Sequence, residues 1–186
     1  MATYGLKNLY RAPVTVGTGG EITYGTPVKM AAAIQVDIAV EFKEGKLEAD
    51  DKTAKKKVFK KALLTINQAD LPPADRAALL GETEDLDGVV YSGMNDNPPR
   101  FAIGYQMAMD DGLYTWKWLY DVKFSVPNET GITDKEDAFE YTTSTIVGDV
   151  SRRESDNLWQ ATHVAAPDDT VAAAWFTAVR EPNLAA

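Results

Sequence analysis

The sequence predicts a mainly β fold, an antiparallel β-sandwich or barrel with one or two short helices packed on it. Apolar and polar residues alternate over residues 34–43, and the alternation returns over residues 101–109, 114–126 and 139–147. Side chains of a strand point to opposite faces in turn, so each run indicates a strand with one apolar and one polar face. Long amphipathic strands are typical of antiparallel sheets that place one face on a core.

The N-terminal part of the chain predicts an extended arm. Residues 1–27 contain five glycines and two prolines, which favour turns and allow at most a short strand over residues 14–16. The first long strand is expected over residues 31–43. A turn at Glu44-Gly45 and a short strand over residues 46–49 should follow it.

Capping signals predict two short helices. Asp70 can cap a helix over residues 72–80 that begins with two prolines and ends at a glycine. Asp168 or Asp169 can cap a second helix over residues 170–180, which a following proline ends. These segments complete the expected architecture, in which helices pack on a sheet.

The later strands are separated by clear turns. Asp110-Asp111-Gly112 predicts a short hairpin, and two further strands are expected over residues 138–150 and 158–164. In the strand after the hairpin, six alternating aromatic and apolar residues are expected to share one core-facing side. These residues are Tyr114, Trp116, Trp118, Tyr120, Val122 and Phe124.

The composition indicates one acidic domain. The chain has 186 residues and a formal net charge of −9, so we expect a single domain over residues 1–186. The absence of cysteine excludes disulfides, thiolate catalysis and cysteine metal sites. Acidity argues against tight binding to DNA, whose phosphates attract basic surfaces.

No apolar run approaches the roughly 20 residues of a membrane span, and the first residues lack a signal-peptide core. We therefore expect no membrane partner and no Sec export.

The residue types also argue against an enzyme. His163 is the only histidine, and it alternates with apolar neighbours on an expected strand, so a structural role is favoured. The carboxylate pairs occupy expected turns and helix caps, and no cofactor is indicated.

One alternative function belongs to a different class. Trp116 and Trp118 are residues of the kind that bind sugars or bases, which would make the chain a carbohydrate-binding β-sandwich.

A lysine-rich segment stands out against the acidic background. Residues 43–61 carry a net charge of +4, so the rest of the chain carries −13, and strand character resumes over residues 58–66. A mixed-charge segment with few apolar residues is expected to be solvated and mobile in an isolated subunit. We predict that residues 44–57 form a charged loop that contacts an acidic neighbouring subunit. The candidate residues of this assembly loop are Lys46, Glu48, Asp50, Asp51, Lys52, Lys55, Lys56 and Lys57.

Five segments spread over nearly the whole chain form a collinear pattern. They are Gly5-Leu6-Lys7-Asn8-Leu9-Tyr10, Leu47-Glu48-Ala49-Asp50-Asp51, Asn95-Asp96-Asn97-Pro98-Pro99 leading into Phe101-Ala102-Ile103-Gly104-Tyr105, residues 118–127, and Thr145-Ile146-Val147-Gly148. In this order they resemble the major tail protein, or tail tube protein, family of long non-contractile-tailed bacteriophages. The lysines of residues 52–61 and the aromatic C-terminal segment match no part of that pattern.

The resemblance implies a tail-tube-like fold and a structural function in the virion. In the family, subunits form hexameric rings that stack into a tube, and neighbouring sheets join into one barrel around a channel for DNA ejection. The implied partners are further copies of the chain, the tape measure protein, and tail-terminating and tail-tip proteins, with DNA as passing cargo. The implied location is the virion tail, assembled in the host cytoplasm. The inner tube of a contractile injection apparatus has the same architecture and is the nearest alternative.

The polar face of the first strand is the candidate channel wall under this resemblance. Asp37 and Glu41 lie on one face of the expected strand, opposite Ile38 and Val40, and Glu140 would join them from a later strand. At physiological salt, carboxylates repel phosphate over about 8 Å, so wall residues are the ones that matter. The predicted channel-lining residues are therefore Asp37, Glu41 and Glu140, and no catalytic, cofactor or metal site is expected.

Overall fold

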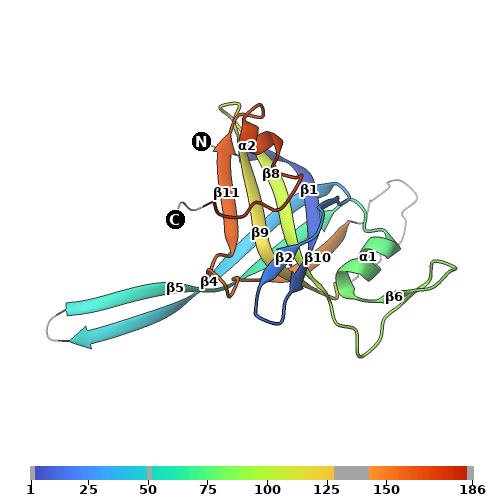
Figure 1. Ribbon diagram of the computed structural model, residues 1–186, viewed down its shortest axis with the longest axis horizontal. Helices are drawn as coiled ribbons and strands as arrows, with labels where there is room; N and C mark the ends of the chain where they lie inside the picture. The colour runs from blue at the N-terminus through green and yellow to red at the C-terminus, as the bar shows by residue number, and fades with distance from the viewer. Residues whose placement is uncertain (1–2, 50–51, 128–142, 184–186) are drawn as a thin grey trace, which may run out of the picture.

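The computed structural model describes residues 3–49, 52–127 and 143–183, and it confirms a mainly β fold with short helices. One large antiparallel sheet dominates the molecule (Figure 1). Its strands are β1 (Thr3–Val16), β2 (Ile22–Tyr24), β3 (Val28–Lys29), β4 (Ala33–Ala49), β5 (Lys52–Gln68), β8 (Arg100–Met109), β9 (Tyr114–Ser125), β10 (Ser144–Ser151) and β11 (Gln160–Ala165). A two-stranded ribbon and two helices are attached to it: β6 (Thr83–Glu84), β7 (Val90–Tyr91), α1 (Pro73–Leu80) and α2 (Thr170–Ala173).

The large sheet is curled but open. Its strand order is β2-β1-β8-β9-β10-β5-β4, with β3 added to β1 and β11 added to β9. The curl brings the two halves of the sheet over one apolar core, to which one half contributes Leu9 and Ile103 and the other contributes Leu64 and Ile66. Within the described residues no ladder joins β4 to β1, so the sheet forms an incomplete barrel.

A β-bulge in β9 changes which side chains of that strand face the core. β8 and β9 pair Ile103 with Leu119 and then Phe101 with Val122, so three steps along β9 match two steps along β8. Before the bulge, Trp116, Trp118 and Tyr120 point to the outer side, and after it Val122 and Phe124 point to the core. The prediction that all six alternating residues share one side is wrong, because an inserted residue leaves no mark in the alternation.

The outer side of β8 and β9 is covered by α2 and the residues that follow it. Asp169 caps α2, as predicted, by accepting hydrogen bonds from the N–H groups two and three residues further on. The longer helix predicted here is wrong, because α2 spans four residues. The indole N–H of Trp118 donates to the carbonyl of Trp175 (3.0 Å), and the hydroxyl of Tyr120 donates to the carbonyl of Arg180 (2.8 Å). These two carbonyl groups therefore accept hydrogen bonds from side chains of β9, in place of the backbone hydrogen bonds of a longer helix.

The helix α1 ends as predicted but begins differently. Gly81 closes it in the left-handed conformation with φ of 70°. A β-carbon at this position would lie 2.6 Å from the carbonyl oxygen of Asn97, so a larger residue would be strained. The prediction that Asp70 caps the helix is wrong, since Pro72 is the N-cap and makes no side-chain hydrogen bond. A proline at the first helical position has no N–H that needs a partner.

The N-terminal segment is an interior strand of the sheet. β1 pairs with β8 along most of its length and with β2 and β3 on its other side, and Ala12 is fully buried. Gly5 (φ 67°) and Asn8 (φ 53°) take left-handed conformations where the register with β8 shifts. The short strand predicted over residues 14–16 is confirmed as the end of β1. The prediction of an extended arm is wrong for residues 3–13, because bulges let a strand contain residues typical of turns.

Residues 44–49 and 52–57 belong to two long paired strands, so the prediction of a loop is wrong for them. The strand predicted over residues 46–49 is confirmed as part of β4. β4 and β5 have 17 residues each and stay paired as far as Ala49 and Lys52, well beyond the core (Figure 1). The turn predicted next to Glu44 is replaced by a ladder pair between Glu44 and Lys57. The loop was predicted because the segment has few apolar residues. The ladder hydrogen bonds between two strands join backbone groups, so they form without a core.

The remaining predicted turns and strands agree with the structure where it describes them. Asp110-Asp111-Gly112 joins β8 to β9, and Gly112 has φ of 82°. β11 occupies most of the strand predicted over residues 158–164. β10 begins at Ser144, and residues 128–142 lie outside the described chain, so the first part of the strand predicted over residues 138–150 is not placed.

The close approach of Trp118 to Gly104 yields a stability prediction. These two residues pair directly across β8 and β9, and a β-carbon on Gly104 would lie 2.7 Å from the indole ring. Replacing Gly104 by Val should lower the free energy of unfolding by about 1–3 kcal/mol, since a well-packed core does not accept added carbons. Denaturant unfolding measures this effect, with Gly19→Ala at an exposed turn as the control that should change little. An unchanged unfolding free energy in Gly104→Val would contradict the packing described here.

Candidate functional site: an open sheet face, a free edge and a charged hairpin

No described segment covers one part of the outer sheet surface. We call this part the open face, and it comprises the outward-pointing residues of β4, β5, β10 and the last part of β9. Along β4, Val36, Ile38 and Val40 pack against the core, so Asp37 and Glu41 point to the open face and are exposed. The prediction that Asp37 and Glu41 share a solvent-exposed face is confirmed.

Most charged groups of the open face are joined in pairs. The pairs are Glu41–Lys60 (3.1 Å), Asp149–Lys61 (3.0 Å) and Asp121–Arg100 (3.0 Å). Asp37 differs, because its Oδ2 accepts a hydrogen bond from the side-chain amide of Gln35 at 2.7 Å. The open face is therefore a surface of mixed charge and not a uniformly acidic one.

Asp121 is the least accessible of these carboxylates. Its side chain is 5% exposed, whereas that of Glu41 is 50% exposed. Burial raises the pKa of Asp121, and the guanidinium of Arg100 opposes that rise. At the solvated Lys61, the hydrogen bond to Asp149 raises the lysine pKa. The open face thus combines one desolvated carboxylate with ion pairs that remain in contact with water.

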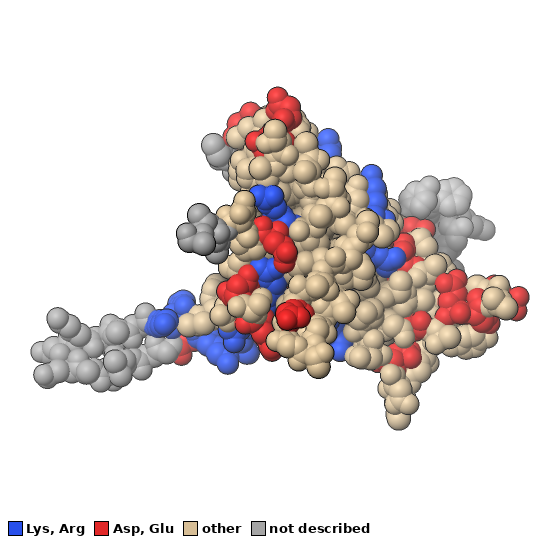
Figure 2. All heavy atoms as spheres, in the orientation of Figure 1, with Lys and Arg blue, Asp and Glu red and all other residues tan. Residues whose placement is uncertain are grey.

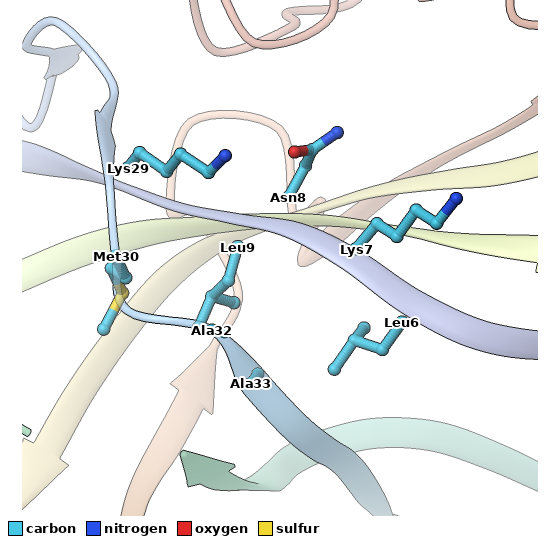
Figure 3. Close-up of a pocket in the computed structure, with 8 residues that line it drawn as sticks. All are labelled: Leu6, Lys7, Asn8, Leu9, Lys29, Met30, Ala32 and Ala33. Atoms are coloured by element: carbon cyan, nitrogen blue, oxygen red, sulfur yellow. The ribbon is translucent and has the colours of Figure 1, made fainter. Parts of the chain in front are cut away.

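Among the residues that the structure describes, those lining two hollows of the molecule do not form an active site. One, of about 310 Å³, lies on the open face beside Arg100, Asp121 and Asp149, whose charged groups are already paired. The other, of about 280 Å³, lies between β1 and the start of β4 (Figure 3). Leu9 and Met30 lie toward its apolar side, and its charged lining residues are lysines. This second hollow lies at the seam where the barrel stays open.

The histidine and the possible metal ligands give no catalytic arrangement in the part of the chain that is described. His163 Nε2 lies 3.1 Å from Asp169 Oδ1, and its ring stacks on that of Trp175. His163 therefore ties β11 to the cap of α2. Within the described ranges, no group of three or more His, Asp or Glu side chains is placed to hold a metal ion. The described helices are too short and too polar to cross a membrane.

The tryptophans named for sugar binding are buried. Trp116 and Trp118 are 6% and 0% exposed. The ring of Phe176 lies against both, with centroid distances of 5.6 and 5.9 Å. Rings inside the protein offer no platform to a sugar, so the carbohydrate-binding alternative loses the residues on which it depended.

β4 forms a free edge of the sheet. Among the described strands it pairs with β5 alone, so the other side of a 17-residue strand has no ladder partner there. Ile34 and Phe42 on this strand are more than half exposed. A long, exposed edge with apolar side chains is a template for pairing with another chain.

The charged hairpin formed by the ends of β4 and β5 extends this free edge. Lys56 and Lys57 are exposed, and Lys57 pairs with Glu44 across the ladder at 2.7 Å. By backbone register Lys46, Glu48, Lys52 and Lys55 lie in the two strands, whereas Asp50, Asp51 and the channel candidate Glu140 lie outside the described residues. The prediction that these residues contact a neighbouring subunit stays a prediction.

The sequence reasoning missed the cations that pair with the open-face carboxylates. Asp149 alternates with the core residue Val150, so its exposure was readable from the pattern. Its partner Lys61 lies 88 positions away in the chain and is brought beside it by the pairing of β10 with β5. No local sequence signal reports such a contact.

The burial of Asp121 yields a pH prediction. Because the pKa of Asp121 is raised in the folded state, its ionised form opposes folding at neutral pH, and this opposition fades as the pH falls through the raised pKa. The unfolding free energy of Asp121→Asn minus that of the parent protein should therefore be larger at pH 7 than at pH 3. Arg100→Gln should show the reverse trend, since it removes the opposing cation. Unfolding free energies across this range measure both, and a larger loss in Asp121→Asn at pH 7 would show that the ion pair outweighs desolvation.

Comparison with known proteins adds no identity. No protein-family model matches the chain, and a search of curated proteins finds no match. The function is therefore argued from the sheet edge, the hairpin and the open face.

Proposed function

We propose that this chain is a structural virion protein, the subunit of a phage tail tube in which hexameric rings stack around a channel for DNA. The observation that carries the proposal is the free edge of β4, extended by a hairpin that projects beyond the core (Figure 1). A sheet that is curled into an incomplete barrel has room for strands of a neighbouring copy at its open seam. The segments that resemble tail tube proteins add to this proposal.

Self-assembly explains the edge in physical terms. An unpaired edge of 17 residues invites aggregation in a monomer, and a defined partner strand removes that hazard. Ile34 and Phe42 gain burial when that edge is covered. A head-to-tail contact between identical rings repeats without limit and gives a filament, which is the form a tube requires.

The open face suits a wall along which DNA slides. Binding of phosphate depends on free Lys and Arg side chains that release counterions. On the part of this face that lies over the core, Lys60, Lys61 and Arg100 are each held by a carboxylate, so phosphate would have to displace that partner. Lys123 on the same part donates a hydrogen bond to the side chain of Asn97. Asp37 and Glu41 are proposed to line the channel on this face, and the chain's net charge of −9 further weakens attraction to DNA.

The proposal also sets the partners and the location. The main partner is the chain itself, and tape measure, tail-terminating and tail-tip proteins would contact the ends or the interior of the tube. The site of action is the virion tail, after assembly in the host cytoplasm. No catalytic step is part of the proposal. The inner tube of a contractile apparatus would use the same edge and face, and recruitment of a sheath protein distinguishes the two.

Assembly is tested by electron microscopy and sedimentation of the concentrated protein. We expect rings or tubes of uniform width. Ile34→Lys with Phe42→Lys should abolish them, because charges on the free edge oppose strand pairing. Thr162→Lys with Val164→Lys also adds two lysines, at exposed positions of β11 outside the seam between β1 and β4, and is the control that should still assemble. A wild-type protein that stays monomeric at every concentration would overturn the proposal.

The channel role is tested in virions that carry variant subunits. Asp37→Lys with Glu41→Lys adds unpaired cations to the open face, so tubes should form but DNA release should slow by an order of magnitude or more. Asp110→Lys with Asp168→Lys makes the same charge change at exposed turns away from the open face and is the matched control. Equal release rates in the two variants would show that the open face does not line the channel.

A further inference from the structure

A small lobe projects from the end of the molecule opposite the β4–β5 hairpin (Figure 1). The lobe comprises residues 82–96, and its base is the ladder that pairs Thr83 with Tyr91. Asp85 holds the turn, since its Oδ1 accepts hydrogen bonds from the N–H groups of Asp87 and Val89, each at 2.9 Å. The lobe is therefore an ordered projection with a defined tip.

The tip presents an apolar side chain to solvent. Leu86 is fully exposed, and Val89 on the same turn is 47% exposed. A turn that is fixed by hydrogen bonds could carry polar residues at these positions without loss of its structure. Ordered, exposed apolar side chains rimmed by polar groups mark contact sites in soluble proteins. The tip of the lobe thus has the character of a contact surface.

The charge of the lobe restricts the partner. Residues 82–96 contain five carboxylates and no Lys or Arg. Figure 2 shows acidic residues gathered at this end of the molecule and basic residues at the base of the hairpin. Glu84 and Asp87 are exposed beside Leu86 and form no ion pair with another described residue. A surface that buries Leu86 should therefore supply cations beside an apolar group.

The base of the hairpin on a second copy of the chain has this complementary pattern. Val58 is 49% exposed and lies directly opposite Lys43 in the ladder. Lys56 is two residues from Val58 and points to the same side of the hairpin. Both lysines are exposed and make no ion pair with another described residue. Val58 thus faces solvent between two ammonium groups at one end of the molecule. At the other end, Leu86 faces solvent between two carboxylates.

We infer that the lobe of one copy docks on the hairpin base of the next copy, with Leu86 against Val58 and with Glu84 and Asp87 beside Lys43 and Lys56. The two surfaces lie at opposite ends of one molecule, so each contact leaves a free lobe and a free hairpin. Such a heterologous contact continues from copy to copy. This inference rests on the self-assembly proposed above and names a surface through which it proceeds.

The test is a charge exchange between two variants. The lobe variant is Glu84→Lys with Asp87→Lys, and the hairpin variant is Lys43→Glu with Lys56→Glu. Asp85 stays unchanged, because it holds the turn. Each variant alone places like charges on both surfaces, so the concentration needed for assembly should rise at least tenfold at low salt. An equimolar mixture should assemble almost as well as the wild type, since each lobe then meets a hairpin of opposite charge.

Two further variants separate apolar contact from charge. Leu86→Ser should weaken assembly without changing the charge of the lobe. Met94→Ser removes a side chain that is 99% exposed on the following turn and lies outside the inferred contact, so it should assemble normally. Circular dichroism and thermal unfolding of every variant establish that the subunits remain folded. Sedimentation velocity and electron microscopy report assembly.

The outcomes distinguish this inference from the proposed function. If the lobe variant or Leu86→Ser assembles like the wild type, the inferred contact is wrong and self-assembly stands. If both charge variants fail and their mixture fails as well, the lobe and the hairpin contact different partners and the inference is overturned. If the wild type itself never assembles, the proposed function fails and the inference fails with it. Recovery in the mixture alone supports the contact.

Discussion

The β-bulge in β9 is the constraint on which the rest of the structure depends. Before the bulge, Trp118 and Tyr120 point outward and bind the C-terminal segment through the carbonyls of Trp175 and Arg180. After it, the outward positions carry polar residues such as Asp121, while Val122 enters the core. One inserted residue thus divides the outer sheet surface into a covered half and an open, charged half.

The open half makes sense only together with the free edge beside it. Half of the sheet has a covering layer, and the other half has paired charges, a strand with one free edge among the described strands, and a protruding hairpin. A protein that functions alone would carry these features as an aggregation hazard, whereas a subunit of an assembly uses them. The same reasoning makes the acidic lobe and the lysine-bearing hairpin two ends of one repeating contact.

Much of the fold was predictable because its signal is local. Alternation located β4, β8 and β9, and the turn at Asp110-Asp111-Gly112 and the cap at Asp169 follow from residue preferences. The interior position of β1 was missed, because the bulges at Gly5 and Asn8 resemble turn signals. Of the outer hairpin only the strand over residues 46–49 was predicted, because charged strands without a core resemble loops. In the candidate site, the exposure of Asp37 and Glu41 was predictable, but the cations that pair with the open-face carboxylates depend on contacts between distant strands.

The central claim is that neighbouring copies complete this open sheet. Cryo-electron microscopy of the assembled protein tests it most directly, because it resolves which strands of adjacent subunits are hydrogen-bonded. The account predicts that the edge of β4 pairs with a strand of the next copy and that the open face lines the lumen. An assembly in which the edge of β4 and the open face both face outer solvent would contradict it.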